Sequence, residues 1–95
     1  MYRVEVNMKT VVRREIDRTQ WLGEKKERRV ERQTVRILEA IAVTIEREHP
    51  PSYKLLGRLS KLDPGVIANI VKGDASLNRL IWQCMRFTSE KCMPK

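Results

Sequence analysis

The fold of this chain is decided by residues 52–73, S-Y-K-L-L-G-R-L-S-K-L-D-P-G-V-I-A-N-I-V-K-G. Apolar residues recur at helical spacing in both halves of the stretch, at Leu55, Leu56, Leu59 and Leu62 and then at Ile67, Ile70 and Val71. Ser52 suits the N-cap of a first helix, and Asp63 followed by Pro64 suits the start of a second. Gly73 is placed to end the second helix. Two short helices joined by a tight turn form a helix-turn-helix unit.

This stretch resembles the helix-turn-helix of lambda-repressor-like (Cro and xenobiotic-response-element type) DNA-binding domains. The consensus sequence of these domains is close to S-Q-E-E-L-A-K-L-L-G-V-S-P-S-T-I-S-R-I-E-R-G. It aligns with residues 52–73 without a gap. The matching positions are Ser52, Leu56, Gly57, Leu59, Leu62, Asp63, Pro64, Ile67, Ile70, Lys72 and Gly73. The resemblance implies a small all-α domain of four to five helices, in which Gly57 is the small residue where the helices touch.

The chain also departs from the family pattern. Tyr53 replaces the usual Gln, and Lys61 replaces the Gly of the turn. A residue with a side chain is therefore expected to take a left-handed backbone at position 61, at some cost in free energy. The second helix carries small or apolar residues where relatives carry longer polar side chains, so it offers few groups that could recognise bases.

The resemblance implies that residues 64–72 enter the major groove of DNA while the preceding helix crosses the backbone. Asn69 is the best base reader, because an amide can bond adenine at two points. The other expected base contacts are Val66, Gly65 and Ala68, and the expected phosphate contacts are Tyr53, Lys54, Arg58, Lys72 and Arg79. For Asn69 the alternative is an ordinary exposed helix residue.

A single short helix reads only a half-site, so a homodimer on a pseudo-palindrome is expected, with half-sites about 34 Å apart. The function expected from this resemblance is that of a sequence-specific transcriptional regulator, such as a phage or mobile-element repressor. Two alternatives remain open. One is a protein-interaction module, for instance an antitoxin-like or inhibitor protein that uses the helix-turn-helix as a scaffold. The other is an architectural protein that binds DNA through charge alone.

Residues 1–23 form an N-terminal extension. Tyr2, Val4, Val6 and Met8 alternate with polar residues, which predicts a short β-strand, although a frayed terminus or the start of a helix would look similar. A short amphipathic helix is expected over residues 9–22, ending near Gly23. The chain has no room for the fifth helix that follows in many relatives. We therefore expect the extension to replace that helix, either by completing the core or by forming the dimer through Trp21, Leu22, Val4 and Val6.

The helix-turn-helix domain is expected to span residues 24–87. A long helix over residues 24–48 has a charged first half and an apolar second half, and the sequence His49-Pro50-Pro51 should end it. Its basic residues suggest either a solvated helix face or an arm that contacts phosphates. After residue 73, Ser76 suits the N-cap of a last helix whose apolar face is Leu77, Leu80, Ile81, Cys84 and Met85, with Trp82 off that face. Residues 88–95 are expected to be a flexible tail.

Composition narrows the function further. Twenty Lys and Arg against twelve Asp and Glu give a net charge of +8, which suits a polyanion such as nucleic acid, although a small protein can also simply be basic. One His, two Cys eight residues apart and no Gly-rich phosphate loop argue against an enzyme, a structural metal or any cofactor. The sequence shows no signal-peptide pattern and no apolar run long enough for a membrane span, so we expect a cytoplasmic or nucleoid-associated protein with free thiols.

Overall fold

The protein is described by a computed structural model that covers residues 8–26 and 29–92, with side chains described for residues 8–21 and 32–88. Five α-helices follow one another along the chain: α1 Met8–Lys26, α2 Arg29–Glu46, α3 Tyr53–Ser60, α4 Pro64–Lys72 and α5 Ala75–Cys92. No strand occurs among these residues, so the expectation of an all-α domain is confirmed. The strand expected at the N-terminus falls mostly outside the described residues, and Met8 is the first residue of α1.

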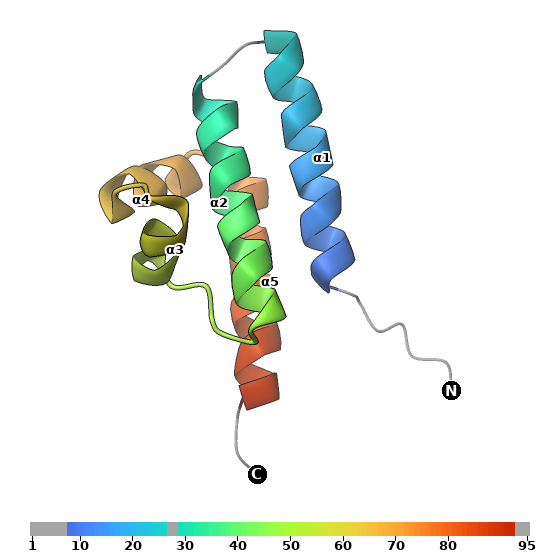
Figure 1. The fold of residues 1–95 in the computed structure, drawn as a ribbon, viewed down its shortest axis with the longest axis vertical. Helices are drawn as coiled ribbons and strands as arrows, with labels where there is room; N and C mark the ends of the chain where they lie inside the picture. Colours follow the sequence, from blue (N-terminus) through green and yellow to red (C-terminus); the bar gives the residue numbers. More distant parts are fainter. Residues whose placement is uncertain (1–7, 27–28, 93–95) are drawn as a thin grey trace.

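The helices are arranged around α2. Figure 1 shows α1 and α2 side by side, with α5 behind α2 and the short pair α3–α4 on the side of α2 that faces away from α1. The helix α2 contacts each of the other four helices. Its pattern explains this position, because the residues between Thr34 and Ile45 that are buried cover more than one side of the helix.

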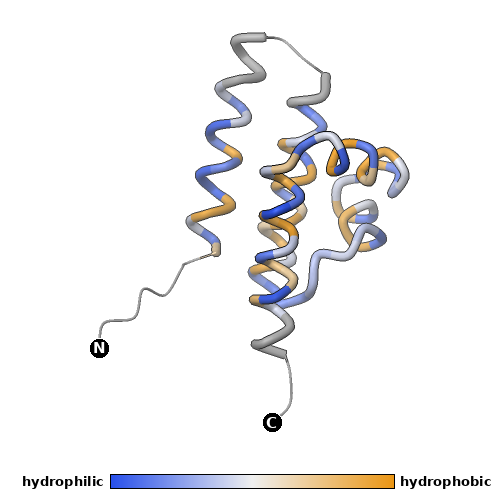
Figure 2. Tube along the Cα trace, turned by 180° about the vertical axis from the view of Figure 1, so that it is seen from behind, coloured by the Kyte–Doolittle hydropathy of each residue, from blue (hydrophilic) through white to orange (hydrophobic). Residues whose placement is uncertain are grey.

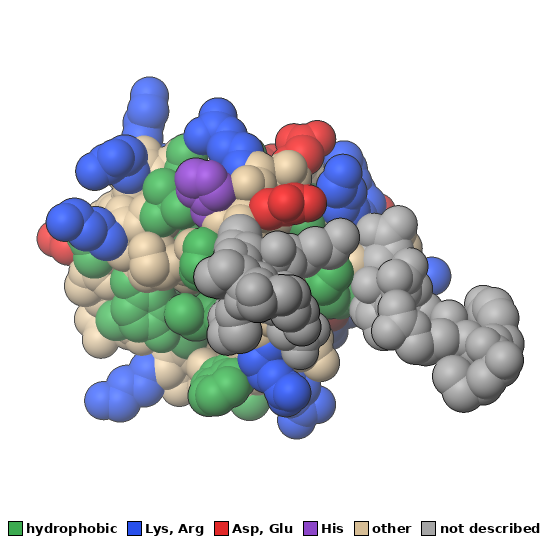
Figure 3. All heavy atoms as spheres, turned by 90° about the horizontal axis from the view of Figure 1, so that it is seen from below, with side chains coloured by type: hydrophobic (Ala, Val, Ile, Leu, Met, Phe, Trp, Pro, Cys, Tyr) green, Lys and Arg blue, Asp and Glu red, His purple; other side chains and the backbone are tan. Residues whose placement is uncertain are grey.

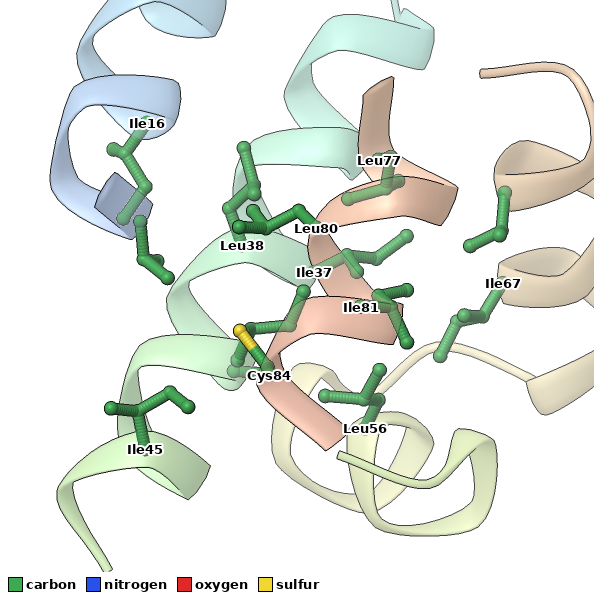
Figure 4. Packing of buried hydrophobic residues seen from close by; sticks show 14 of the residues in the cluster. Ile16, Ile37, Leu38, Ile45, Leu56, Ile67, Leu77, Leu80, Ile81 and Cys84 are labelled. Atoms are coloured by element: carbon green, nitrogen blue, oxygen red, sulfur yellow. The ribbon is translucent and has the colours of Figure 1, made fainter. Parts of the chain in front are cut away.

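The core is aliphatic and draws on every helix. Figure 4 shows side chains of α2 and α5 meeting Leu56 from α3 and Ile67 from α4. The buried apolar residues are Met8, Val12, Ile16, Ile37, Leu38, Ala40, Ile41, Ile45, Leu56, Ile67, Val71, Leu77, Leu80, Ile81 and Cys84. Figure 2 shows that hydrophobic and hydrophilic positions alternate along each helix, so each helix has an apolar side for the core.

The helix α1 belongs to this core. Met8, Val12 and Ile16 lie one turn apart along it, and all three are buried. Of the two roles considered for the N-terminal extension, α1 therefore takes the core-completing one. Dimerisation through the extension stays a prediction.

Several helix boundaries differ from those expected. The helix α1 does not end near Gly23 but continues to Lys26, and α2 begins only at Arg29, so residues 24–48 do not form one helix. A glycine inside a helix costs about 1 kcal/mol relative to alanine, which is tolerable in a helix that the core already holds. The helix α2 also ends at Glu46, two residues before the end expected at residue 48, so residues 47 and 48 form a turn ahead of His49-Pro50-Pro51.

The last helix also differs from its expected extent. It begins at Ala75 with Asp74 as its cap, because the amide of Leu77 donates to the Asp74 carboxylate at 3.1 Å; the expected cap Ser76 lies inside the helix. The helix does not stop near Phe87 but runs to Cys92. Thr88 was expected in a flexible tail, yet it is fully buried and its hydroxyl donates to the carbonyl of Cys84 at 2.8 Å.

Cys84 is a buried free thiol at the centre of α5. Burial raises the pKa of the Cys84 thiol from 9.0 to about 12, because the apolar surroundings disfavour the thiolate. The side chain therefore acts as a small apolar core residue at neutral pH. No helix in the described part of the chain is both long and apolar enough to cross a membrane.

The place of α1 in the core can be tested by truncating Ile16, which is 6% exposed. Ile16→Ala should lower the free energy of unfolding by about 2–5 kcal/mol, because it removes buried methylenes and leaves a cavity. Urea unfolding followed by circular dichroism measures this change. Arg14→Ala, at an exposed position of the same helix, is the matched control and should change stability by about 0.5 kcal/mol or less. Equal effects of the two substitutions would show that α1 does not pack on the core.

Candidate nucleic-acid interface

The interface is built from α3, α4 and the corner between them. The helix α3 begins where expected, because the Ser52 hydroxyl accepts a hydrogen bond from the amide of Leu55 at 3.2 Å. Ser52 itself has an extended backbone, with φ −68° and ψ 156°, as an N-cap requires. This cap fixes the direction in which Tyr53 and Lys54 leave the first turn of α3.

The corner that follows α3 depends on a left-handed residue. Lys61 has φ 61° and ψ 32°, so the expectation drawn from the missing turn glycine is confirmed. Asp63 then caps α4, since its carboxylate accepts from the amide of Gly65 at 2.9 Å, and Pro64 occupies the first helical position. The chain therefore changes direction between Ser60 and Pro64, and these local contacts help to set the direction of α4.

Gly57 allows α3 and the corner to approach each other closely. A Cβ atom built on Gly57 would lie 2.9 Å from the backbone oxygen of Leu62 and 3.2 Å from the Cγ atom of Pro64. A backbone oxygen cannot move aside as a flexible side chain can, so only glycine fits at this position without a shift. The expectation that Gly57 is the small residue where the helices touch is confirmed.

A long-range hydrogen bond joins this corner to the central helix. The guanidinium of Arg36 on α2 donates to the backbone carbonyl of Ser60, at the C-terminal end of α3. A cation near the end of a helix also interacts favourably with the helix dipole. From the sequence, we expected Arg36 to belong to a basic arm or to a solvated helix face. The hydrogen bond to Ser60 was not predicted, because no spacing rule links positions 24 residues apart.

The helix α4 has one buried and one exposed side. Ile67 and Val71 are buried, and Gly65, Asn69 and Lys72 are exposed. The other two expected base contacts, Val66 and Ala68, are half-buried. The helical period places residues 65, 68, 69 and 72 on one face, with position 66 at its edge. The structure therefore places Gly65, Ala68 and Asn69 on the outer side of α4, with Ala68 half-buried and Val66 at the edge of that side.

The phosphate-contact candidates are exposed and lie on three helices. Tyr53 is 40% exposed, and Lys54 and Arg58 are exposed and four residues apart, so they share the outer side of α3. Lys72 lies at the end of α4, and Arg79 is exposed on α5.

The charge of this segment is mostly of one sign. Residues 53–73 contain four basic residues and a single acidic one, Asp63, which caps α4. The side chains of Lys54, Arg58, Lys72 and Arg79 make no hydrogen bond or ion pair with any described residue. These cations are therefore available to an external anion. Figure 3, which views the molecule from below, shows Lys and Arg side chains projecting from several sides, with hydrophobic side chains between them.

The expected dimer contacts are only partly described. Trp21 is 57% exposed on α1, the side chain of Leu22 is outside the described set, and Val4 and Val6 are outside the described residues altogether. Met85 was expected on the buried face of α5, and this was wrong, because Met85 is 41% exposed. It lies at the edge of the buried stripe, where the helical period alone does not determine the exposure.

Outside the candidate interface, few of the described side chains are arranged to bind a ligand or a metal ion. An open groove of about 330 Å³ between α1 and α2 is lined by cations, Lys9 and Arg13, and by the anions Glu39 and Glu46. Because both signs of charge line it, the groove does not select an anion or a cation. No cluster of three or more His, Cys, Asp or Glu side chains suited to a metal ion occurs in the part of the chain that the structure describes.

Comparisons of the chain with protein-family models, with curated proteins and with solved structures found no match.

The close contact at Gly57 predicts opposite outcomes for two glycine-to-alanine substitutions. Gly57→Ala should destabilise the fold by about 1–2 kcal/mol, since the steric clash outweighs the gain in helix propensity. Gly65→Ala should leave stability unchanged or raise it, because the nearest atom to its Cβ would be an oxygen of Asp63 at an ordinary 3.6 Å. Thermal and urea unfolding of both variants measure the difference. A Gly57→Ala protein as stable as Gly65→Ala would contradict the close approach.

Proposed function

We propose that the protein binds double-stranded DNA sequence-specifically, as a small transcriptional regulator of the lambda-repressor-like helix-turn-helix type. The observation that carries this proposal is the outer face of α4, where Asn69 lies among small residues and Lys72 follows at the helix end. A helix presented in this way, held by a tight corner to a second helix, has the geometry of a major-groove reader.

Local features of the α3–α4 unit support the helix-turn-helix type. Both caps form as the resemblance implies, the corner contains a left-handed residue, and Gly57 provides the close helix contact. Leu56 and Ile67 are fully buried, which anchors each helix to the core. The inner side of the unit is therefore packed into the core and its outer side is exposed, as a DNA-reading element requires.

In the proposed complex, α4 lies in the major groove. Asn69 offers one donor and one acceptor to the edge of an adenine, and the small residues at positions 65 and 68 let the helix approach closely. Lys54, Arg58 and Lys72 contact phosphates on either side and release counterions, which supplies most of the affinity but no sequence preference. Because one amide reads little sequence, two copies bound to two half-sites would provide the specificity.

A second candidate function is that of a protein-interaction module, in which the helix-turn-helix serves as a scaffold. Two observations favour it. The outer face of α4 has few groups that can hydrogen-bond to bases, and α5 exposes a Trp and a Met. A module of this kind would show no preference among duplexes, so the same binding experiment separates the two candidates.

The base-reading role of Asn69 and the phosphate-contacting role of Lys72 predict different losses of DNA binding. Asn69→Ala should reduce the preference for a selected duplex over a random one by about 1–3 kcal/mol, whereas Lys72→Ala should weaken binding to both duplexes alike. Fluorescence anisotropy over a salt series measures both effects, and the wild-type affinity should fall steeply with salt. Gln20→Ala, which removes an exposed amide on α1, is the matched control and should bind as the wild type does.

If both variants lost the same binding affinity for every duplex, Asn69 would not be a base-reading residue. Absence of binding to any duplex at low salt would defeat the DNA-binding proposal and favour the protein-interaction module.

A further inference from the structure

The outward face of α5 carries exposed apolar side chains beside two exposed cations. Trp82 is 64% exposed and Met85 is 41% exposed. Arg79 and Arg86 are exposed as well, and they lie three residues before and four residues after Trp82, so the helical period places all three on one face. Figure 2, which views the molecule from behind, shows α5 in front of α2. The exposure of these side chains leaves the face open to a partner.

The charged side chains described on this face are both cations. All twelve acidic residues of the chain lie outside residues 75–88, and the only charged residues inside this range are Arg79 and Arg86. Neither guanidinium makes a hydrogen bond or an ion pair with any residue that the structure describes. A second copy of the chain would bring like charges together, because its own α5 carries the same two cations. The complement of this face is therefore a partner with negative charge.

The apolar side chains decide which kind of anionic partner fits. The backbone of a DNA duplex offers phosphates but little apolar surface, so it would leave Trp82 and Met85 uncovered. A protein segment can supply carboxylates and apolar side chains together. Trp, Met and Arg are also enriched in the centres of protein–protein contacts, where Trp and Arg often dominate the binding energy. The face therefore fits an acidic protein segment better than a nucleic acid.

We propose that this face of α5 binds an acidic amphipathic helix of a partner protein. Arg79, Trp82 and Arg86 follow the alternating three- and four-residue spacing by which one helix packs along another. The two cations are seven residues apart, which is about 10.5 Å along the helix axis. Two acidic residues seven positions apart on the partner helix span the same distance, so each carboxylate can meet one guanidinium.

The same spacing defines the apolar part of the partner. Residues three and four positions after its first acidic residue lie between the two ion pairs, where apolar side chains would cover Trp82 and Met85. The recognised pattern is therefore an acidic residue, two unspecified residues, two apolar residues, two unspecified residues and a second acidic residue.

This docking does not rest on the proposed function. The helices α3 and α4 lie beside α2, whereas α5 lies behind it (Figure 1). Trp82, Met85 and Arg86 are not among the candidate DNA contacts, and Arg79 is the one residue that the two surfaces share. Binding of an acidic helix and binding of a duplex can therefore be measured separately.

Fluorescence anisotropy of a labelled synthetic peptide, titrated with the full chain at low salt, tests this docking. The Glu peptide is an alanine-rich helix with two Glu seven positions apart and two Leu between them, and the Lys peptide carries Lys in place of both Glu. The wild type should bind the Glu peptide and not the Lys peptide. Trp82→Ala should weaken binding of the Glu peptide roughly tenfold or more, and Arg86→Gln several-fold. Arg14→Gln, which removes an exposed cation from α1, is the matched control and should bind as the wild type does.

A charge exchange separates the proposed ion pairs from a general effect of the positive net charge. The double variant Arg79→Glu, Arg86→Glu should reject the Glu peptide and bind the Lys peptide, although the chain as a whole stays net positive. Circular dichroism of each variant excludes unfolding as the cause of a loss, and Met85→Ser provides a second apolar substitution on the same face.

A wild type that does not bind the Glu peptide would overturn the proposal. So would equal losses for Arg14→Gln and Arg86→Gln, because the net charge alone would then attract the peptide. Tighter binding of a single-stranded oligonucleotide, abolished by Trp82→Ala, would also overturn it and assign the face to stacked bases. Duplex binding is measured in parallel, and Trp82→Ala should leave it unchanged. A protein that binds the Glu peptide but no duplex would defeat only the proposed DNA-binding function, and one that binds a duplex but not the Glu peptide would defeat only the docking.

Discussion

The candidate interface depends on the close approach of α3 to the corner before α4. At Gly57 the backbone carbonyl of Leu62 leaves no room for a Cβ atom. This contact sets the position of α4, because the left-handed backbone at Lys61 and the cap at Asp63 leave the corner little freedom. The direction in which Asn69 projects therefore depends on the close approach at Gly57.

The core holds this unit against the rest of the domain. Leu56 and Ile67 are fully buried among residues of α2 and α5, and Arg36 on α2 bonds the last carbonyl of α3. The basic and small residues on the outer side contribute little to this packing. The surface can therefore change its binding chemistry while the inner side keeps its shape, which is how one scaffold supports different sequence preferences.

The features that could be predicted from the sequence are the local ones. The caps of α3 and α4, the apolar spacing of these two helices and the left-handed Lys61 depend on residues a few positions apart, and they were found as expected, whereas the expected cap Ser76 lies inside α5. The features that could not be predicted depend on distant packing. Gly23 lies inside α1 and Thr88 is buried in α5, although Gly23 was expected to end its helix and Thr88 to lie in a tail. The bond from Arg36 to Ser60 and the exposure of Met85 likewise follow only from how the helices are assembled.

The measurement that tests the central claim most directly is a titration of the isotope-labelled protein with duplex DNA, followed by amide resonances in nuclear magnetic resonance spectra. The account predicts that the amides of residues 52–54 and 65–73 shift first and most strongly, and that those of residues 9–20 on α1 stay in place. Shifts centred on α1, or equal small shifts over the whole chain, would contradict the assignment of α3 and α4 as the reading unit.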